Sequence, residues 1–127
     1  MRILLLTALG FSCFAAPAAA QEPEWHSAPI SGGCLVNAQG ALHGTASWDQ
    51  ACTPGELIAG QGTLSVTYEN GNTVSLTGAF LAGVPDGHAR LLVFDPSGAQ
   101  INEREVDFNM GCALIENARP CTPVPRP

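Results

Sequence analysis

The feature that most constrains this chain is the frequent recurrence of the turn-forming residues glycine, asparagine, aspartate and proline. After the first twenty residues, no segment of ten or more residues keeps a helical period. The short runs between the turn-forming residues instead alternate polar and apolar side chains. Alternation with a period of two is typical of strands whose two faces meet different surroundings. The sequence therefore predicts an all-β fold of consecutive antiparallel β-hairpins.

The clearest hairpin joins the strand-like runs 63–68 and 73–77. A two-residue turn between them would set the apolar face of one strand against the hydroxyl face of the other. A three-residue loop that ends on Gly71, in the left-handed conformation, pairs Val66 with Val74 and puts the apolar side chains on one face. We therefore expect the three-residue loop.

A second hairpin with the same plan is expected around Pro96, which presets the second position of a type I turn. The spacing from Ala89 to Gly98 equals the spacing from Gly62 to Gly71, so the first strand and turn of the two units superpose. Aromatic residues recur 32 and 28 residues apart, each three before a small residue, at Trp48, Phe80 and Phe108. Such periods are typical of stacked units that share a core. An exposed aromatic row that grips a peptide or a sugar is the functional alternative.

A glycine-rich motif surrounds the second of these aromatic residues. It covers residues 76–91 and includes Gly78, Phe80, Gly83 and Gly87. Two degraded copies flank it, and their matching residues are Trp48, Gly60, Gly62, Phe108 and Gly111. The pattern resembles the MORN (membrane occupation and recognition nexus) repeat, although Leu76 and Thr77 replace the family's usual Tyr and Glu.

The resemblance implies one good and two degraded hairpin repeats over residues 44–112. An N-terminal segment, 21–43, would precede them and a proline-rich tail, 113–127, would follow. The glycines would allow tight turns and close strand approach, while the aromatic residues fill the space between layers. The pair Gly33-Cys34 and the segment 48–52, Trp-Asp-Gln-Ala-Cys, are also similar to secreted bacterial relatives of this family.

Residues 1–20 have the three parts of a secretory signal peptide. Arg2 is the charged start, residues 3–16 are an apolar run, and three alanines ending at Ala20 form a small-residue cleavage site. We expect cleavage after Ala20 and a periplasmic or secreted protein. A retained membrane anchor is the alternative, but the apolar stretch is short and Pro17 interrupts it.

Four cysteines follow this segment, and an even number in a short exported chain predicts two disulfides. They are Cys34, Cys52, Cys112 and Cys121. In the repeat geometry Cys52 and Cys112 are equivalent, and about 20 Å would separate them, which is beyond disulfide reach. Of the three possible connectivities, this removes the one that pairs Cys52 with Cys112. Of the remaining two we favour the local bonds Cys34–Cys52 and Cys112–Cys121. We expect no zinc site and no other cofactor, because the spacing of the cysteines and histidines fits none.

The C-terminal tail has a composition of its own. Its alternating prolines forbid a helix and a central strand. Beyond Cys121 we expect an extended, mobile end. A proline-rich ligand for some partner is the alternative.

The charge balance bears on partners. Eleven acidic residues against five basic ones, with a net charge of -6, argue against a nucleic-acid partner. An acidic chain is also repelled by anionic lipids, so the membrane-surface role suggested by the family name stays an alternative. We expect a non-enzymatic module that binds a protein partner or has a structural role in the cell envelope. Such a module predicts a contiguous exposed apolar or aromatic patch on one sheet face.

A small hydrolase is the enzymatic alternative. Its site would centre on His88, in the motif Asp86-Gly87-His88, with His88 or His43 within reach of a serine and an acid. Hydrolysis by paired carboxylates is a second possibility, through Glu103, Glu105 and Asp107. We interpret these three alternating acids instead as the solvated face of a strand near a sheet edge. We expect His26 and His43 to lie in surface loops.

Overall fold

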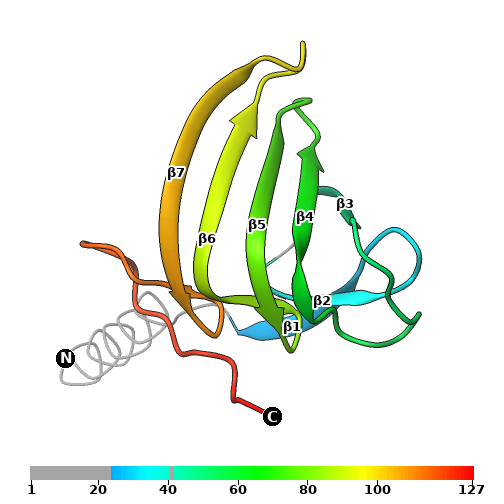
Figure 1. Ribbon diagram of the computed structural model, residues 1–127, viewed down its shortest axis with the longest axis vertical. Helices are drawn as coiled ribbons and strands as arrows, with labels where there is room; N and C mark the ends of the chain where they lie inside the picture. The colour runs from blue at the N-terminus through cyan, green and yellow to red at the C-terminus, as the bar shows by residue number, and fades with distance from the viewer. Residues whose placement is uncertain (1–23, 41) are drawn as a thin grey trace, which may run out of the picture.

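The computed structural model describes residues 24–40 and 42–127, so the expected signal peptide lies outside the described residues. Within them the chain forms eight strands and no helix (Figure 1). All strand pairs are antiparallel. The expected all-β fold of consecutive hairpins is confirmed. No described helix is long and apolar enough to cross a membrane.

The strands form two sheets. The small sheet pairs β1 (Trp25–Pro29) with β2 (Leu35–Gln39). The large sheet follows chain order: β3 (Gly44–Trp48), β4 (Gly60–Tyr68), β5 (Thr73–Leu81), β6 (Val84–Phe94), β7 (Gln100–Asn109) and β8 (Cys112–Ala113). From the sequence, we expect His26 in a surface loop. The loop placement is wrong, because His26 pairs with Ala38 in the β1–β2 hairpin.

The two expected three-residue turns close the upper ends of the large sheet in Figure 1. Val66 pairs with Val74, and Gly71 has a φ of +89°. In the β6–β7 turn, Gly98 has the same φ and its N–H donates to the carbonyl of Asp95 at 2.9 Å. Turn chemistry therefore predicted both loops correctly.

Two-residue turns close the opposite end of the sheet. Ala82 and Gly83 join β5 to β6, and Met110 and Gly111 join β7 to β8, all with positive φ. Positive φ at both positions is the type I′ geometry, which matches the twist of paired strands. The recurrence of an aromatic residue three positions before a glycine thus marks a strand that enters a tight turn. Trp48 differs, since β3 ends there and an irregular segment with Cys52 follows.

The N-terminal hairpin buries part of the large sheet's apolar face. Residues of both sheets and of the segments that connect their strands form one cluster: Ala28, Ile30, Cys34, Val36, Ala46, Ile58 and Phe80. Asn37 of β2 holds the β5–β6 turn, because its N–H donates to the carbonyl of Gly83 at 2.9 Å and its Nδ2 donates to that of Ala82 at 2.7 Å. The N–H of Gly83 in turn donates to the carbonyl of Ile58 at 3.0 Å.

The two disulfides are Cys34–Cys52 and Cys112–Cys121, which confirms the favoured local connectivity. The first joins the N-terminal hairpin to the segment that follows β3. The second closes the segment that follows β8 and ties the tail to the sheet. Because two disulfides persist in oxidising compartments, they are consistent with an exported protein.

The expectation of a mobile end beyond Cys121 is wrong. Val124 is only 8% exposed and packs with Val84 and Met110 in a second cluster. Its N–H donates to the carbonyl of Met110 at 3.0 Å. Trp25 covers this cluster, and its Nε1 donates to the carbonyl of Thr122 at 2.7 Å. An extended proline-rich segment leaves the backbone N–H and carbonyl groups of its other residues available for such bonds. It also loses little conformational entropy when it docks.

We predict that Gly83→Ala lowers the free energy of unfolding by about 3 kcal/mol. The left-handed φ costs roughly 1–2 kcal/mol with a side chain, and the overlap adds a similar amount. An added Cβ at Gly83 would lie 2.7 Å from Cδ2 of Leu57 and 2.8 Å from the backbone nitrogen of Asn37. Gly98→Ala is the matched control, because its φ of +89° is similar and nothing lies within 4 Å. Urea denaturation measures both, and equal losses would contradict this packing.

Candidate functional site

The two faces of the large sheet differ in chemistry. One face carries the apolar side chains that meet the N-terminal hairpin. On β3, β4 and β5 the opposite face carries hydroxyl groups, from Thr45, Ser47, Thr63, Ser65, Thr67, Thr73, Ser75 and Thr77. Hydroxyls of paired residues bond to each other, as in Thr63 with Thr77 at 2.7 Å. On β6 and β7 the same face becomes charged.

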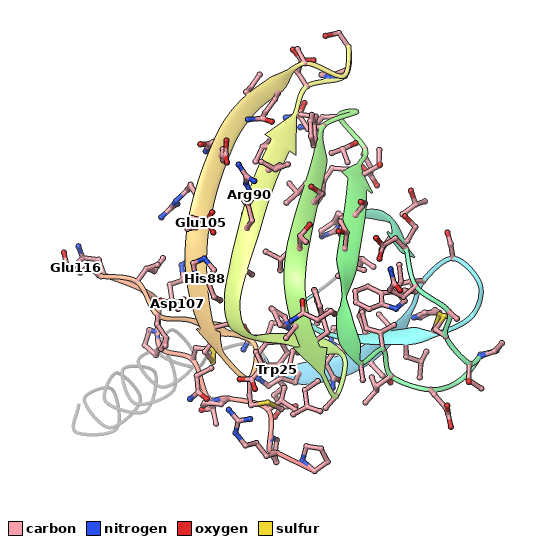
Figure 2. The ribbon with its side chains drawn as sticks, in the orientation of Figure 1. Trp25, His88, Arg90, Glu105, Asp107 and Glu116 are labelled. Atoms are coloured by element: carbon pink, nitrogen blue, oxygen red, sulfur yellow. A yellow bond between two sulfur atoms is a disulfide. The ribbon has the colours of Figure 1, made fainter. Side chains whose placement is uncertain are left out.

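We name the charged part of this face the charged ladder: His88, Arg90, Glu103, Glu105 and Asp107. The strand register places His88 opposite Asp107 and Arg90 opposite Glu105. Nδ1 of His88 lies 2.8 Å from Oδ1 of Asp107, and its Nε2 lies 2.7 Å from Oε2 of Glu105. Arg90 forms an ion pair with Glu103. Figure 2 shows His88, Arg90, Glu105 and Asp107 of the ladder along β6 and β7, and the His88 side chain is 65% exposed.

The charged partners in the ladder shift one another's pKa values. The hydrogen bond that Asp107 accepts from the His88 ring raises the pKa of His88 above its usual 6.5, and the bond that Glu105 accepts adds to the effect. The hydrogen bond from Arg90 lowers the pKa of Glu103. Each ring nitrogen of His88 has a carboxylate as its neighbour, and both nitrogens are engaged within the ladder.

The structure gives the members of the Asp86-Gly87-His88 motif different partners. Asp86 accepts two hydrogen bonds from Arg126, at 2.8 and 3.0 Å, and one from the N–H of Met110. The bonds from Arg126 lower the pKa of Asp86. Gly87 has a φ of +99° next to a register shift in the β5–β6 pairing. Asp86 therefore holds the tail, while His88 belongs to the charged ladder.

In the described part of the chain, the contacts of the His88 ring include no serine hydroxyl of the kind that the expected hydrolase site would use. The hydrogen bonds of the His88 ring go to Glu105 and Asp107. No group of three or more His, Cys, Asp or Glu side chains among the described residues is arranged to hold a metal ion. Glu103, Glu105 and Asp107 lie on an exposed strand, as expected for a solvated face.

The outer edge of β7 is the second feature of this region. β8 pairs only with Phe108 and Asn109, and the N–H of Leu114 donates to the carbonyl of Asp107. Toward its start, β7 has no strand on its outer side in the described chain, and Figure 1 shows it as the outermost long strand. In antiparallel sheets alternate residues direct their backbone groups to opposite neighbours. Since Asp107 points away from β6, Glu105 and Glu103 do so as well.

One of these outward groups has a local partner. The N–H of Glu103 donates to Oδ1 of Asn102 at 2.8 Å. No comparable bond is formed by the N–H of Glu105 within the described residues. Sequence reasoning missed this edge as a site, although it identified the acidic side chains along it.

The expected repeat anchors have several different surroundings. Phe80 is buried and its ring lies 5.0 Å from that of Trp48 in an edge contact. Phe108 is half-buried and lies outside this cluster. The ring of Trp48 leaves no room for a side chain at Gly62. Gly60 begins β4, and Gly78 lies where two strands approach closely. Gly83 and Gly111 lie in the tight turns, and Gly87 lies at the bulge.

The exposed large apolar side chains avoid the middle of both sheet faces. They are Leu57, Tyr68, Ile101, Leu114 and Ile115, which lie at strand ends or in irregular segments. Half-exposed apolar side chains lie next to one another on the apolar face of β4, β5 and β6, where the register aligns Val66, Val74 and Val93. The charged ladder and the open edge of β7 are the further distinguishing features of this sheet.

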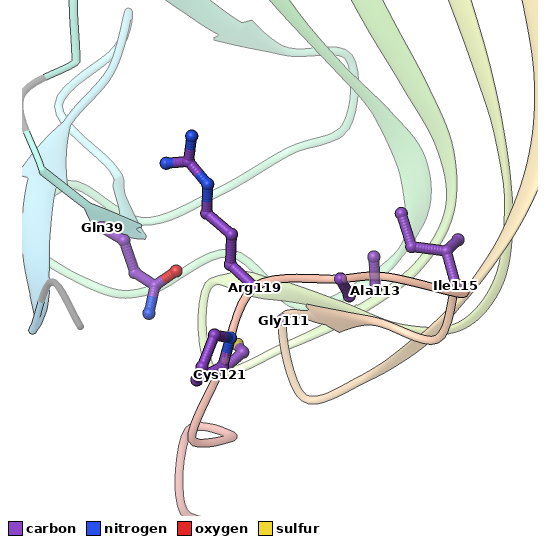
Figure 3. Close-up of a pocket in the computed structure, with 8 residues that line it drawn as sticks. Gln39, Gly111, Ala113, Ile115, Arg119 and Cys121 are labelled. Atoms are coloured by element: carbon purple, nitrogen blue, oxygen red, sulfur yellow. The ribbon is translucent and has the colours of Figure 1, made fainter. Parts of the chain in front are cut away.

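An open pocket of about 430 Å³ lies beside the C-terminal tail (Figure 3). It is lined by Gln39, Gly111, Ala113, Ile115, Ala118, Arg119, Pro120 and Cys121. This lining contains no acid, histidine or serine, so it offers no group for acid–base or nucleophilic chemistry. The pocket is separate from the charged ladder.

Comparison of the chain with known proteins found no match to a protein-family model, to a curated protein or to a solved structure.

We predict that the pKa of His88, measured by NMR titration, lies above 6.5 and falls in Asp107→Asn. Glu105→Gln should lower it less, because the bond to Asp107 is the largest cause of the shift. A raised pKa in the folded state stabilises the fold below pH 6.5, and this contribution is lost as the pH rises through the folded value.

An unchanged His88 pKa in Asp107→Asn would contradict the ladder geometry.

Proposed function

We propose that this chain is an exported, non-enzymatic β-sheet module that binds a protein partner in the cell envelope. The observation that carries the proposal is the open edge of β7, which presents unpaired backbone groups beside an ordered set of charges. Such an edge is a template for an added strand, and strand addition is a common way to bind an extended segment of another protein.

The chemistry of His88 supports a binding role over a catalytic one. A general base needs a ring nitrogen that faces the proton it removes, but both ring nitrogens of His88 lie within 2.8 Å of carboxylates. The hydrolase alternative needs this ring beside a serine hydroxyl. In the proposed module the ladder is a fixed charge pattern rather than a reaction centre.

Export and the MORN resemblance are parts of the same proposal. Two disulfides support an oxidising location, and the signal-like residues 1–20 supply a route to it. The resemblance is supported by the tight turns at Gly83 and Gly111, which follow equivalent aromatic residues. Proteins of stacked hairpins with no enzymatic core act through their surfaces.

The test is capture from an envelope extract by the exported protein, with Glu105→Pro and Glu105→Ala as matched variants. Both variants lose the same carboxylate, but only proline removes the outward N–H and blocks an added strand. We expect a specific envelope protein to be retained by the wild type and by Glu105→Ala, and to be lost with Glu105→Pro.

Two results would overturn the proposal. One is equal retention by the two variants, or no specific retention at all. The other is hydrolytic turnover by the wild type that His88→Ala abolishes. N-terminal sequencing of the exported protein should begin at Gln21, and a chain that keeps residues 1–20 would contradict the proposed processing.

A further inference from the structure

The open edge of β7 has a definite charge pattern, which restricts the strands that can pair with it. Three consecutive outward-directed positions carry acids, at Glu103, Glu105 and Asp107. Their side chains lie on one face, whereas Asn102, Arg104 and Val106 lie on the other. A strand added here would place every second side chain beside an acid.

A second copy of this chain is a poor occupant of the edge. A two-fold axis perpendicular to the sheet would pair β7 with β7 and keep equivalent faces together. Every antiparallel register that overlaps residues 103–107 of both copies then sets two acids opposite each other. Like charges directly opposite destabilise a strand pair. The pattern therefore disfavours self-pairing, which agrees with the way natural sheets protect their edges.

The existing cations leave the pattern acidic. Arg90 pairs with Glu103, and the single ring of His88 lies between Glu105 and Asp107. Three carboxylates thus face one guanidinium and one imidazole. The side chains of Glu105 and Asp107 are 54% and 64% exposed, so an incoming cation can reach them. The chain as a whole carries a net charge of -6, which favours a basic partner at longer range.

We propose that the edge of β7 binds an extended peptide segment with lysine or arginine at alternate positions. The inference rests on the proposed binding function and names the chemistry of its partner. Backbone groups of the segment would bond to the outward groups of Glu105 and its neighbours, which gives affinity regardless of sequence. Its alternate cations would lie beside Glu103 and Glu105, and near Asp107 where Leu114 ends the open stretch, which gives specificity.

The test uses three synthetic peptides of nine residues. In the first, lysine alternates with valine; in the second, glutamate replaces lysine; in the third, the lysines and valines of the first are grouped in two blocks. We expect the alternating lysine peptide to bind, the glutamate peptide not to bind, and the blocked peptide to bind more weakly. Isothermal titration at low and physiological salt measures the affinities, and salt should weaken the binding.

Variants of Glu105 locate the site. Glu105→Ala should weaken binding of the alternating peptide about two- to five-fold, the usual effect of one exposed charge. Glu105→Pro should abolish it, and NMR contacts between the bound peptide and residues 103–107 should disappear with it. Circular dichroism of both variants confirms that the sheet is intact.

The inference is overturned if the lysine and glutamate peptides bind equally, if the blocked peptide binds as well as the alternating one, or if Glu105→Pro binds like Glu105→Ala. It is also overturned if the wild type is a dimer that Glu105→Pro dissociates, since a second copy would then occupy the edge. Envelope capture that depends on the edge, together with no preference for lysine, would retain the proposed function and reject the basic partner. Lysine-specific peptide binding without envelope capture would retain the preference of the edge for a basic strand and reject the proposed envelope function.

Discussion

The fold depends on how the tight turn at Ala82 and Gly83 is held from both sides. A meander of strands with one apolar face cannot cover that face by itself, so a second layer is required. Asn37 fixes the N-terminal hairpin to this turn through its backbone and its side chain. The Cys34–Cys52 disulfide ties the same hairpin to the segment after β3. Together these contacts position the cluster around Phe80 and leave the far side of the sheet uncovered.

A single bulge determines the chemistry of that far side. Phe94 pairs with Gln100 and Val93 with Asn102, so Ile101 is an extra residue in β7. Without this extra residue, the register set by the β6–β7 turn would place Arg90 opposite Arg104 and His88 opposite Val106, so that no acid would face His88. A one-residue slip exchanges the two faces of a strand. The bulge therefore converts a repulsive pairing into the ladder of opposite charges.

The parts of the fold that follow from local chemistry could be predicted from the sequence. The turn at Gly71 follows from turn chemistry and matched apolar faces, and the repeat spacing led to the local disulfides. The packing of β1 and β2 on a turn far along the chain has no local signature, and neither has the docking of Val124. The ladder was missed for a related reason, because alternation shows the acids but not a bulge at Ile101. Sequence patterns thus predicted the hairpins, while long-range contacts created the candidate site.

The central claim is that the edge of β7 is open in the isolated protein and available to another chain. Residue-resolved amide hydrogen exchange tests this most directly, because adjacent residues of an edge strand direct their N–H groups to opposite sides. We predict slow exchange at Arg104 and Val106, whose N–H groups face β6, and fast exchange at Glu105, whose N–H faces outward. Slow exchange at all three amides would show that the edge is already covered and would contradict the account.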